Sequence, residues 1–273
     1  MDTNKRKQDQ TDRFTADKLL FVQRNWDSWP TSRIGEMLYA NTGGYHSLSD
    51  SQNGSPIHVQ RSACFELKGP EFDELKKLRD DKKLNYLRFH IGANSSAERQ
   101  SFIDQDPIFT LILEAVLKKS KTKGQAENPF YPLTWRPQPL YANTKDLAGA
   151  EAIATQTADL FCRSFCQLKT SELGEIFEAA IGTGVYRLNN FSFRSEASGN
   201  SKQPQKNSVE KQIRRKLKKA DKLCISFGES APFPGHPYRF RPILVLEQDK
   251  KGSNADPDYP ANFEFSIHCP PIC

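Results

Sequence analysis

The chain has 273 residues and a mass of 31.0 kDa, enough for one large domain or two small ones. Hydrophobic residues make up 37% and charged residues 26%, a composition that excludes wholesale disorder. The net charge of +6 permits contact with nucleic acid but does not require it. No apolar run approaches the ~18 residues of a membrane helix, and the basic start lacks the apolar core of a secretory signal, so we expect a cytoplasmic protein with no membrane span.

The first half of the chain mixes helical and strand patterns. Residues 1–13 are expected to form a flexible basic N-terminus. Apolar spacing and breaking residues predict helices over 15–26, from Thr31 or Ser32 to Gly43, and over 71–83, and strands over 58–67, 86–92 and 108–117. The proline-rich segment that follows, PLTWRPQPLYA (132–142), is predicted to be extended.

The second half follows a similar order. The patterns predict helices over 147–168, 171–180 and 209–222, strands over 185–194, 223–228 and 240–248, and a last strand over 261–268. Few apolar residues occur over 195–208, so this segment is predicted to be a flexible loop. The mixed order of elements predicts an α+β fold.

Five segments of the first half resemble five segments of the second half in the same order. They pair ADKLLFVQRNW (16–26) with ADLFCRSFCQL (158–168), SRIGEMLYA (32–40) with SELGEIFEA (171–179), LRFHIGANS (87–95) with LCISFGESA (223–231), FTLILEAVLKK (109–119) with PILVLEQDKK (242–251), and NPFYP (128–132) with DPDYP (256–260). The offset falls from 142 (16 against 158) to 128 (128 against 256), as expected if linkers were shortened in the second copy.

The similarity predicts two tandem repeats of an α-α-β-α-β-β unit that form a pseudo-dimer. The units would span residues 14–145 and 146–273, the second ending in an extended tail at 266–273. The alternative is two unrelated α+β halves with similar hydrophobic patterns. The sequence leaves open whether the units face each other or pair into one sheet.

One short motif resembles the core of PD-(D/E)xK nucleases. Glu66 and Lys68 lie on a predicted strand with Asp50 sixteen residues upstream, an order in which two carboxylates hold Mg²⁺ and a lysine assists the attacking water. The resemblance implies a Mg²⁺-dependent nuclease that uses Asp50, Glu66 and Lys68. Glu-x-Lys is a common tripeptide, and no proline precedes Asp50, so the alternative is a solvated strand edge.

The six cysteines are expected to be reduced thiols. Cys162 and Cys166 lie about one helical turn apart, and with Cys269 and Cys273 they would make a four-thiolate zinc site in a zinc-stabilised module. The alternative is that Cys162 and Cys166 are small buried residues among apolar neighbours.

The basic helix predicted over 209–222 would either contact phosphates or expose a solvated face while Val209, Ile213 and Leu217 pack inward.

The sequence contains no strong catalytic motif, so we expect a non-enzymatic binding or self-assembling protein. Its extended segments would contact a protein partner or neighbouring copies by pairing with a sheet edge. The expected contact residues are Trp135, Tyr141, Phe265, Cys269, Pro270, Pro271 and Cys273.

Overall fold

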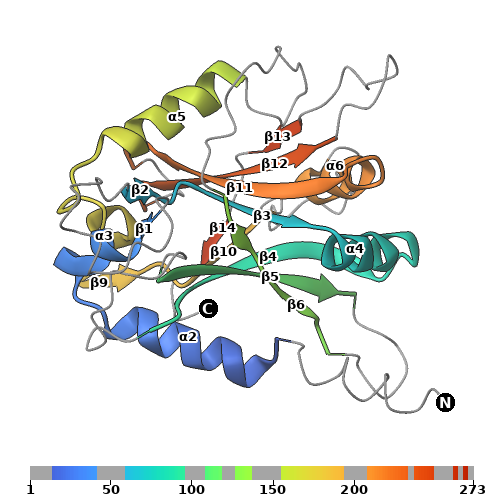
Figure 1. Cartoon of the computed structure of the whole chain (residues 1–273), viewed down its shortest axis with the longest axis horizontal. Coiled ribbons are helices and arrows are strands. Elements are labelled where there is room, and N and C mark those ends of the chain that lie inside the picture. The colour runs from blue at the N-terminus through green and yellow to red at the C-terminus, as the bar shows by residue number, and fades with distance from the viewer. Residues whose placement is uncertain are drawn as a thin grey trace, which may run out of the picture.

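The computed structural model describes residues 14–41, 59–95, 108–118, 127–136, 155–193, 208–232, 237–248, 261–263 and 267–269. The fold of these residues is mixed α+β, as predicted. Two antiparallel sheets lie face to face, and helices cover their outer faces (Figure 1). The expected flexible segment 1–13 lies outside the described residues, as does all of 195–208 except Ser208.

Each of the two large sheets has five strands. From edge to edge, sheet I contains β14 (Ile267–Cys269), β10 (Asn190–Phe193), β4 (Leu84–Ala93), β5 (Phe109–Leu117) and β6 (Phe130–Pro132). Sheet II contains β13 (Ala261–Phe263), β12 (Phe240–Glu247), β11 (Lys222–Glu229), β3 (Cys64–Lys68) and β7 (Thr134–Trp135).

Neither half of the chain forms either of these large sheets alone. In sheet I, β10 from the second half pairs with β4 from the first, and Phe191 lies opposite Phe89. In sheet II, β3 from the first half pairs with β11 from the second, and Phe65 lies opposite Ile225. The two halves are therefore joined by backbone hydrogen bonds within both sheets.

Phenylalanine side chains fill the space between the sheets. Phe109 of sheet I contacts Phe65 and Phe227 of sheet II, with ring centroids 5.5 and 5.3 Å apart. Phe191 and Phe240 meet across the same interface at 5.8 Å. All five rings are at most 2% exposed. Each such aromatic pair adds about 0.5–1.5 kcal/mol beyond the burial of its surface.

One long helix covers each outer sheet face. Helix α2 (Ala16–Ser28) begins at Thr15, whose hydroxyl accepts a hydrogen bond from the Lys18 amide, and lies on sheet I. Helix α5 (Thr155–Gln167) lies on the outer face of sheet II (Figure 1). Each helix packs closely against a strand glycine, Gly92 under α2 and Gly228 under α5. A Cβ at either position would collide with a side chain of the covering helix.

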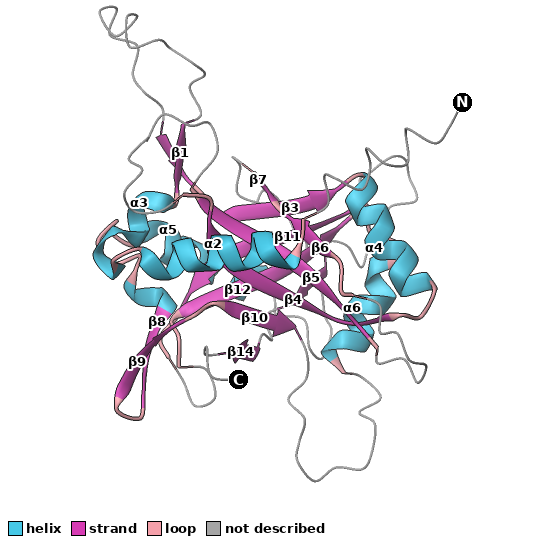
Figure 2. Cartoon of the chain, turned by 90° about the horizontal axis from the view of Figure 1, so that it is seen from below, coloured by secondary structure: helices cyan, strands magenta, loops and turns pink. Residues whose placement is uncertain are grey.

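Two further helices lie together at one end of the sheets, as Figure 2 shows for α4 (Pro70–Asp80) and α6 (Val209–Leu217). The burial of Val209, Ile213 and Leu217 confirms the predicted inward face of α6. Each helix also donates a side-chain hydrogen bond to a backbone carbonyl of the other half. Lys76 donates to Ala220, two residues before β11, and Arg214 donates to Leu84 at the start of β4.

Short elements connect these layers. They are η1 (Thr31–Arg33), α3 (Ile34–Met37), η3 (Glu175–Phe177), and two separate hairpins, β1 (Tyr39–Asn41) with β2 (Val59–Arg61) and β8 (Glu178–Ile181) with β9 (Gly184–Arg187). Figure 2 shows the β8–β9 hairpin projecting from the body of the molecule. Gly182 at its tip has a φ of 62°, which suits the tight two-residue turn.

An arginine from the second half binds the end of α2. Arg187 Nη1 donates to the carbonyl oxygens of Trp26 and Trp29 at 3.1 and 2.6 Å. Its Nη2 donates to the Thr31 hydroxyl and to Glu178. The last carbonyls of a helix lack partners within the helix, so a guanidinium there satisfies them and offsets the helix dipole.

An arginine from the first half binds the end of α5 in the same way. Arg61 Nη1 donates to the carbonyl oxygens of Phe165 and Cys166 at 2.9 and 3.0 Å, and Nη2 donates to that of Leu168 at 2.7 Å. The Tyr39 hydroxyl accepts from the same guanidinium. Each half thus supplies the arginine that caps the helix of the other.

Three single strands of the sequence prediction are wrong, because each is divided between separate sheets. Residues 58–67 form β2 and β3, 185–194 form β9 and β10, and 261–268 begin as β13 and continue into β14. The first two breaks follow the same pattern. The Ser62 and Leu188 amides donate to the Leu38 and Phe177 carbonyls, which extends the β1–β2 and β8–β9 hairpins by one residue, and the chain then crosses to a different sheet.

Three predicted helices are shorter than expected. The helix expected from 31 to 43 ends at Met37, and β1 follows it. The helix expected over 171–180 is a turn, the 3-10 helix η3 and strand β8, because 178–181 pair with β9 instead. The helix over 209–222 ends at Leu217, because residues from Lys222 pair with both neighbouring strands of sheet II. The expected helix 147–168 is described only from Thr155.

We predict that Arg61→Ala and Arg187→Ala each lower the free energy of unfolding by about 2–4 kcal/mol, because each removes two or three charge-assisted hydrogen bonds to helix-end carbonyls. Chemical denaturation monitored by circular dichroism measures the loss. The control is Arg24→Ala, since Arg24 is exposed on α2. Losses no larger than that of the control would contradict the capping role.

Candidate functional site

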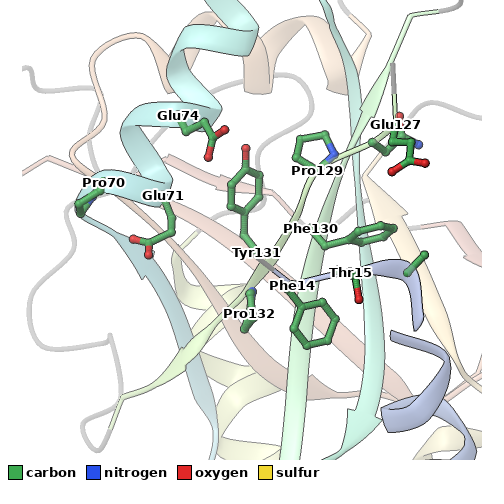
Figure 3. A pocket seen from close by; sticks show the side chains of 12 residues that line it. Phe14, Thr15, Pro70, Glu71, Glu74, Glu127, Pro129, Phe130, Tyr131 and Pro132 are labelled. Atoms are coloured by element: carbon green, nitrogen blue, oxygen red, sulfur yellow. The ribbon is translucent and has the colours of Figure 1, made fainter. Parts of the chain in front are cut away.

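The described part of the chain has a groove of about 670 Å³ at the edge of sheet I (Figure 3). Three segments form its walls: the residues that enter α2, the first turns of α4, and strand β6 with the residues before it. The lining residues are Phe14, Thr15, Ala16, Pro70, Glu71, Glu74, Glu127, Asn128, Pro129, Phe130, Tyr131 and Pro132. The volume lies within the range of ligand sites, roughly 300–1,000 Å³.

Local sequence explains how α4 reaches the groove. Gly69 has a φ of 69°, a conformation that glycine adopts easily, and it turns the chain from β3 into α4. Pro70 then occupies the first turn of the helix, where its missing N–H is tolerated. Phe72 and Leu75 pack into the core, which leaves Glu71 and Glu74 on the groove side.

The backbone of β6 offers little for strand addition at its outer edge. The Pro129 carbonyl and the Leu133 amide bond to β5, so by strand alternation Phe130 and Pro132 direct their backbone groups outward. Phe14 already forms a β-bridge with Phe130. Pro132 has no N–H to donate. Contacts in the groove therefore depend on side chains.

The groove combines carboxylates with aromatic faces. Its twelve lining residues include three glutamates and no lysine, arginine or histidine. Phe14 and Phe130 are partly exposed, while Tyr131 is 3% exposed and belongs to the core. Figure 3 shows the ring of Tyr131 between the α4 glutamates and β6.

A buried polar network supports the β6 side of the groove. Glu114 of β5 accepts hydrogen bonds from His90 Nε2 at 2.8 Å and from Asn128 Nδ2 at 2.6 Å, and it forms an ion pair with Arg88 at 3.2 Å. His90 Nδ1 is 3.3 Å from the side-chain amide nitrogen of Gln23. A proton on Nε2 lets the ring donate to Glu114 and accept from Gln23. The network fixes Asn128, a lining residue, to the sheet.

This environment sets the ionisation of Glu114. Burial acts to raise the pKa of its carboxyl group, but the hydrogen bonds from His90 and Asn128 and the Arg88 charge outweigh that effect. The pKa of Glu114 therefore lies below the ordinary 4.5. The carboxylate remains charged throughout the neutral range and binds its partners firmly.

The structure places Glu66 and Lys68 on the outer face of sheet II in a group of mutual ion pairs. Lys68 pairs with Glu66, and Arg136 lies 3.9 Å from Glu66 and 3.4 Å from Glu247. Lys222 also pairs with Glu247 at 3.0 Å. Basic side chains thus flank the carboxylates of Glu66 and Glu247. Asp50, the third residue of the nuclease hypothesis, lies outside the described residues.

The cysteines proposed as zinc ligands occupy different surroundings. Cys162 of α5 is buried against Cys64 and Cys224, whereas Cys166 is exposed. Cys269 belongs to β14 of sheet I, and Cys273 lies outside the described residues. Within the described ranges, no three metal-ligating side chains are grouped to hold an ion.

Buried thiols lie beside the ion pairs of sheet II. A hydrogen bond with Cys64 and burial both raise the pKa of the Cys224 thiol. The more exposed Cys166 is only partly desolvated by its neighbours, but this outweighs the Arg61 charge and raises the pKa of its thiol as well. Thiolates are the reactive form of cysteine, so these raised values give Cys224 and Cys166 little nucleophilic character near neutral pH.

Two of the expected partner contacts pair within the chain. Trp135 lies in β7 opposite Phe65, and Cys269 lies in β14 opposite Asn190. These extended segments therefore form the edge strands of the protein's own sheets. The other expected contacts, Tyr141, Phe265, Pro270, Pro271 and Cys273, lie outside the described residues.

The groove was not predicted from the sequence, in which residues 71–83 give only a predicted helix and NPFYP only a repeated segment. The useful pattern was the spacing of Glu71 and Glu74, which lie on one helix face, combined with the aromatic and proline content of 128–132. Nothing in the sequence indicated that these segments adjoin.

No family model matches the chain, and no curated protein or solved structure is significantly similar to it. Among the described residues, no helix has the length and apolar character needed to span a membrane.

We predict that Glu114→Gln lowers the free energy of unfolding by about 2–3 kcal/mol near neutral pH, because Arg88 loses a buried anionic partner. Because the folded-state pKa of Glu114 is lowered, its stabilising charge is fully present above 4.5 and is lost as the pH falls through the lower folded value. Urea unfolding across this range should show the two proteins converge in acid. A difference that is independent of pH would contradict the role of the charge.

Proposed function

We propose that the protein is a non-enzymatic binding protein whose partner occupies the groove between α4, β6 and the start of α2. The observation that carries this proposal is the lining: apolar rings and prolines with a few carboxylates, in a hollow of about 670 Å³. Such a lining suits binding, because apolar surface supplies affinity and a few polar groups supply orientation.

The other polar groups support a structural role. The Glu114 network lies beneath α2 and the groove, with His90 and Glu114 at most 7% exposed. On sheet II, Glu66 is 7% exposed and already paired with Lys68. Carboxylates held by protein cations have less capacity to bind Mg²⁺, so these contacts favour a stabilising role over the nuclease alternative.

We also propose that the chain is a duplicated unit arranged as a pseudo-dimer. The order of the sheets supports it: β14, β10, β4, β5 and β6 of sheet I correspond to β7, β3, β11, β12 and β13 of sheet II. Each sheet then has three strands from one unit and two from the other. Ile112 pairs with Pro132, and Val245, the residue that corresponds to Ile112 in the second unit, pairs with Asn262. In the structure Pro132 therefore corresponds to Asn262, two residues beyond the Pro260 that the match of NPFYP with DPDYP gives.

The contacts between the halves support the same proposal. Arg61 and Arg187 bind carbonyls at positions that differ by 139 residues, 165 and 168 against 26 and 29. This is the offset of SRIGEMLYA (32–40) to SELGEIFEA (171–179), three less than the 142 at which the sequence match pairs 16–26 with 158–168. Two glycines add a reciprocal pair. A Cβ on Gly35 would overlap the Thr170 carbonyl, and a Cβ on Gly174 would overlap the Thr31 carbonyl, also at an offset of 139.

We predict that a phage-displayed library of random peptides enriches sequences that bind the wild-type protein and lose binding to Ala16→Trp. Ala16 is exposed and lines the groove, so the indole fills it. Leu20→Trp is the control, because Leu20 is exposed on the same helix but does not line the groove. Peptides that bind both variants equally, or no enrichment, would overturn the proposed site.

Association through the extended segments is a second candidate function. The observation that favours it is that β7 and β14 occupy corresponding edges of the two sheets, so such segments already pair with sheet edges within the chain. Apolar side chains are also exposed at Phe21 (60%), Leu160 (60%) and Val185 (70%). In an assembly, a neighbouring copy would supply the edge strand.

We predict that the wild-type chain elutes as an oligomer at high concentration and that deletion of 266–273, which removes β14, abolishes association. Size-exclusion chromatography with light scattering gives the mass at several concentrations. A wild-type mass of 31.0 kDa throughout, or unchanged assembly of the truncated protein, would contradict this second candidate.

A further inference from the structure

The groove is acidic in a protein whose overall charge is basic. Glu71 and Glu74 come from α4 and Glu127 comes from the segment before β6, so the carboxylates stand on opposite walls. The whole chain carries a net charge of +6, yet among the residues that the structure describes no basic side chain lines this groove. A ligand between the walls meets negative charge from both sides, which favours a cation.

The aromatic rings of the groove point to the same ligand. Elsewhere in the described chain, guanidinium or ammonium groups lie over the rings of Trp29, Tyr39, Phe72, Tyr86 and Trp26 at 5.2 to 5.7 Å. Within the described ranges, no cationic side chain of this protein lies over Phe14 or Phe130 in that manner. Such contacts stabilise a cation by about 0.5–2 kcal/mol.

The backbone arrangement restricts how a ligand binds. The backbone of Phe14 already pairs with that of Phe130, and Pro132 has no N–H to donate. A bound peptide therefore gains no ladder of strand hydrogen bonds along β6. An extended peptide that needs no strand pairing fits this edge, and prolines together with long cationic side chains match the surface. Polyproline-type segments bind aromatic-lined grooves in this way.

We infer that the groove binds an extended peptide rich in lysine or arginine and proline, with a cationic side chain between the three glutamates and against Phe14 and Phe130. This inference rests on the proposed binding function and adds its ligand class. The binding energy comes from ion pairing and from the aromatic faces, so affinity falls as salt screens the charges.

The test uses the full chain and a fluorescent peptide of alternating proline and lysine, with alternating proline and glutamate as its counterpart. Fluorescence anisotropy measures both. We expect the lysine peptide alone to bind, and Glu71→Gln with Glu74→Gln to weaken it at least about tenfold, which corresponds to about 1.4 kcal/mol. Removing both charges from α4 lowers the attraction without blocking the groove.

The matched control is Asp73→Asn with Asp80→Asn, which removes the same charge from exposed positions of α4 outside the groove. The Kd of this control should stay within about twofold of the wild-type value, whereas the groove double variant should weaken binding at least about tenfold, or about 1.4 kcal/mol. Equal weakening by both double variants would overturn the inference, because it would indicate general attraction to an acidic helix.

Three other results would also overturn it: no binding of the lysine peptide, equal binding of the glutamate peptide, or displacement by spermidine at similar concentration. The last would assign the groove to free polyamines. If the library instead yields groove-dependent peptides without lysine or arginine, the cationic ligand class is wrong while the proposed binding function stands.

Discussion

Backbone pairing between the two halves is the constraint on which the rest of this structure depends. The β10–β4 and β3–β11 pairs place a strand of each half within the sheet of the other, so neither sheet is complete without both. The inner faces of these sheets then enclose the phenylalanine core. Because hydrogen bonding and core packing both cross between the halves, we expect the chain to fold as one cooperative unit rather than as two separate domains.

The arginines at the helix ends extend this constraint to the outer layers. Arg187 and Arg61 each hold the last carbonyls of a helix that begins in the other half of the chain. Their guanidinium groups provide several donors in a planar arrangement, which suits several nearby carbonyl acceptors better than a lysine ammonium does. The helices are thereby fixed at the ends where the short elements of the two halves meet.

The proposed ligand site is a consequence of where these layers stop. β6 is short, follows Pro129 and ends in Pro132, and this protects the sheet edge from adding another strand. Helix α4, which follows a strand of sheet II, lies beside this edge of sheet I and contributes its acidic first turns. The groove thus lies between the edge of sheet I and a helix that follows sheet II in the chain. The Glu114 network holds one wall to the strands behind it.

The sequence by itself determined much of the local structure. Apolar spacing identified α2, α4 and the inward face of α6, and continuous apolar runs located β4, β5, β11 and β12, because these elements have strong periodicity or full burial. The sequence also predicted the mixed α+β class. The cysteine, nuclease and extended-segment hypotheses came from residue types alone, and these contain no information on which segments adjoin.

Only the tertiary structure decided which strands share a sheet. Residues 58–67 and 185–194 read as single strands, but each divides after the last hydrogen bond of its hairpin, at Ser62 and Leu188, and continues in a large sheet. The same holds for the groove, whose walls lie more than fifty residues apart in the chain at Glu71 and Phe130. Local propensity reports on neighbours along the chain, whereas these pairings depend on contacts that form only when the two halves pack together.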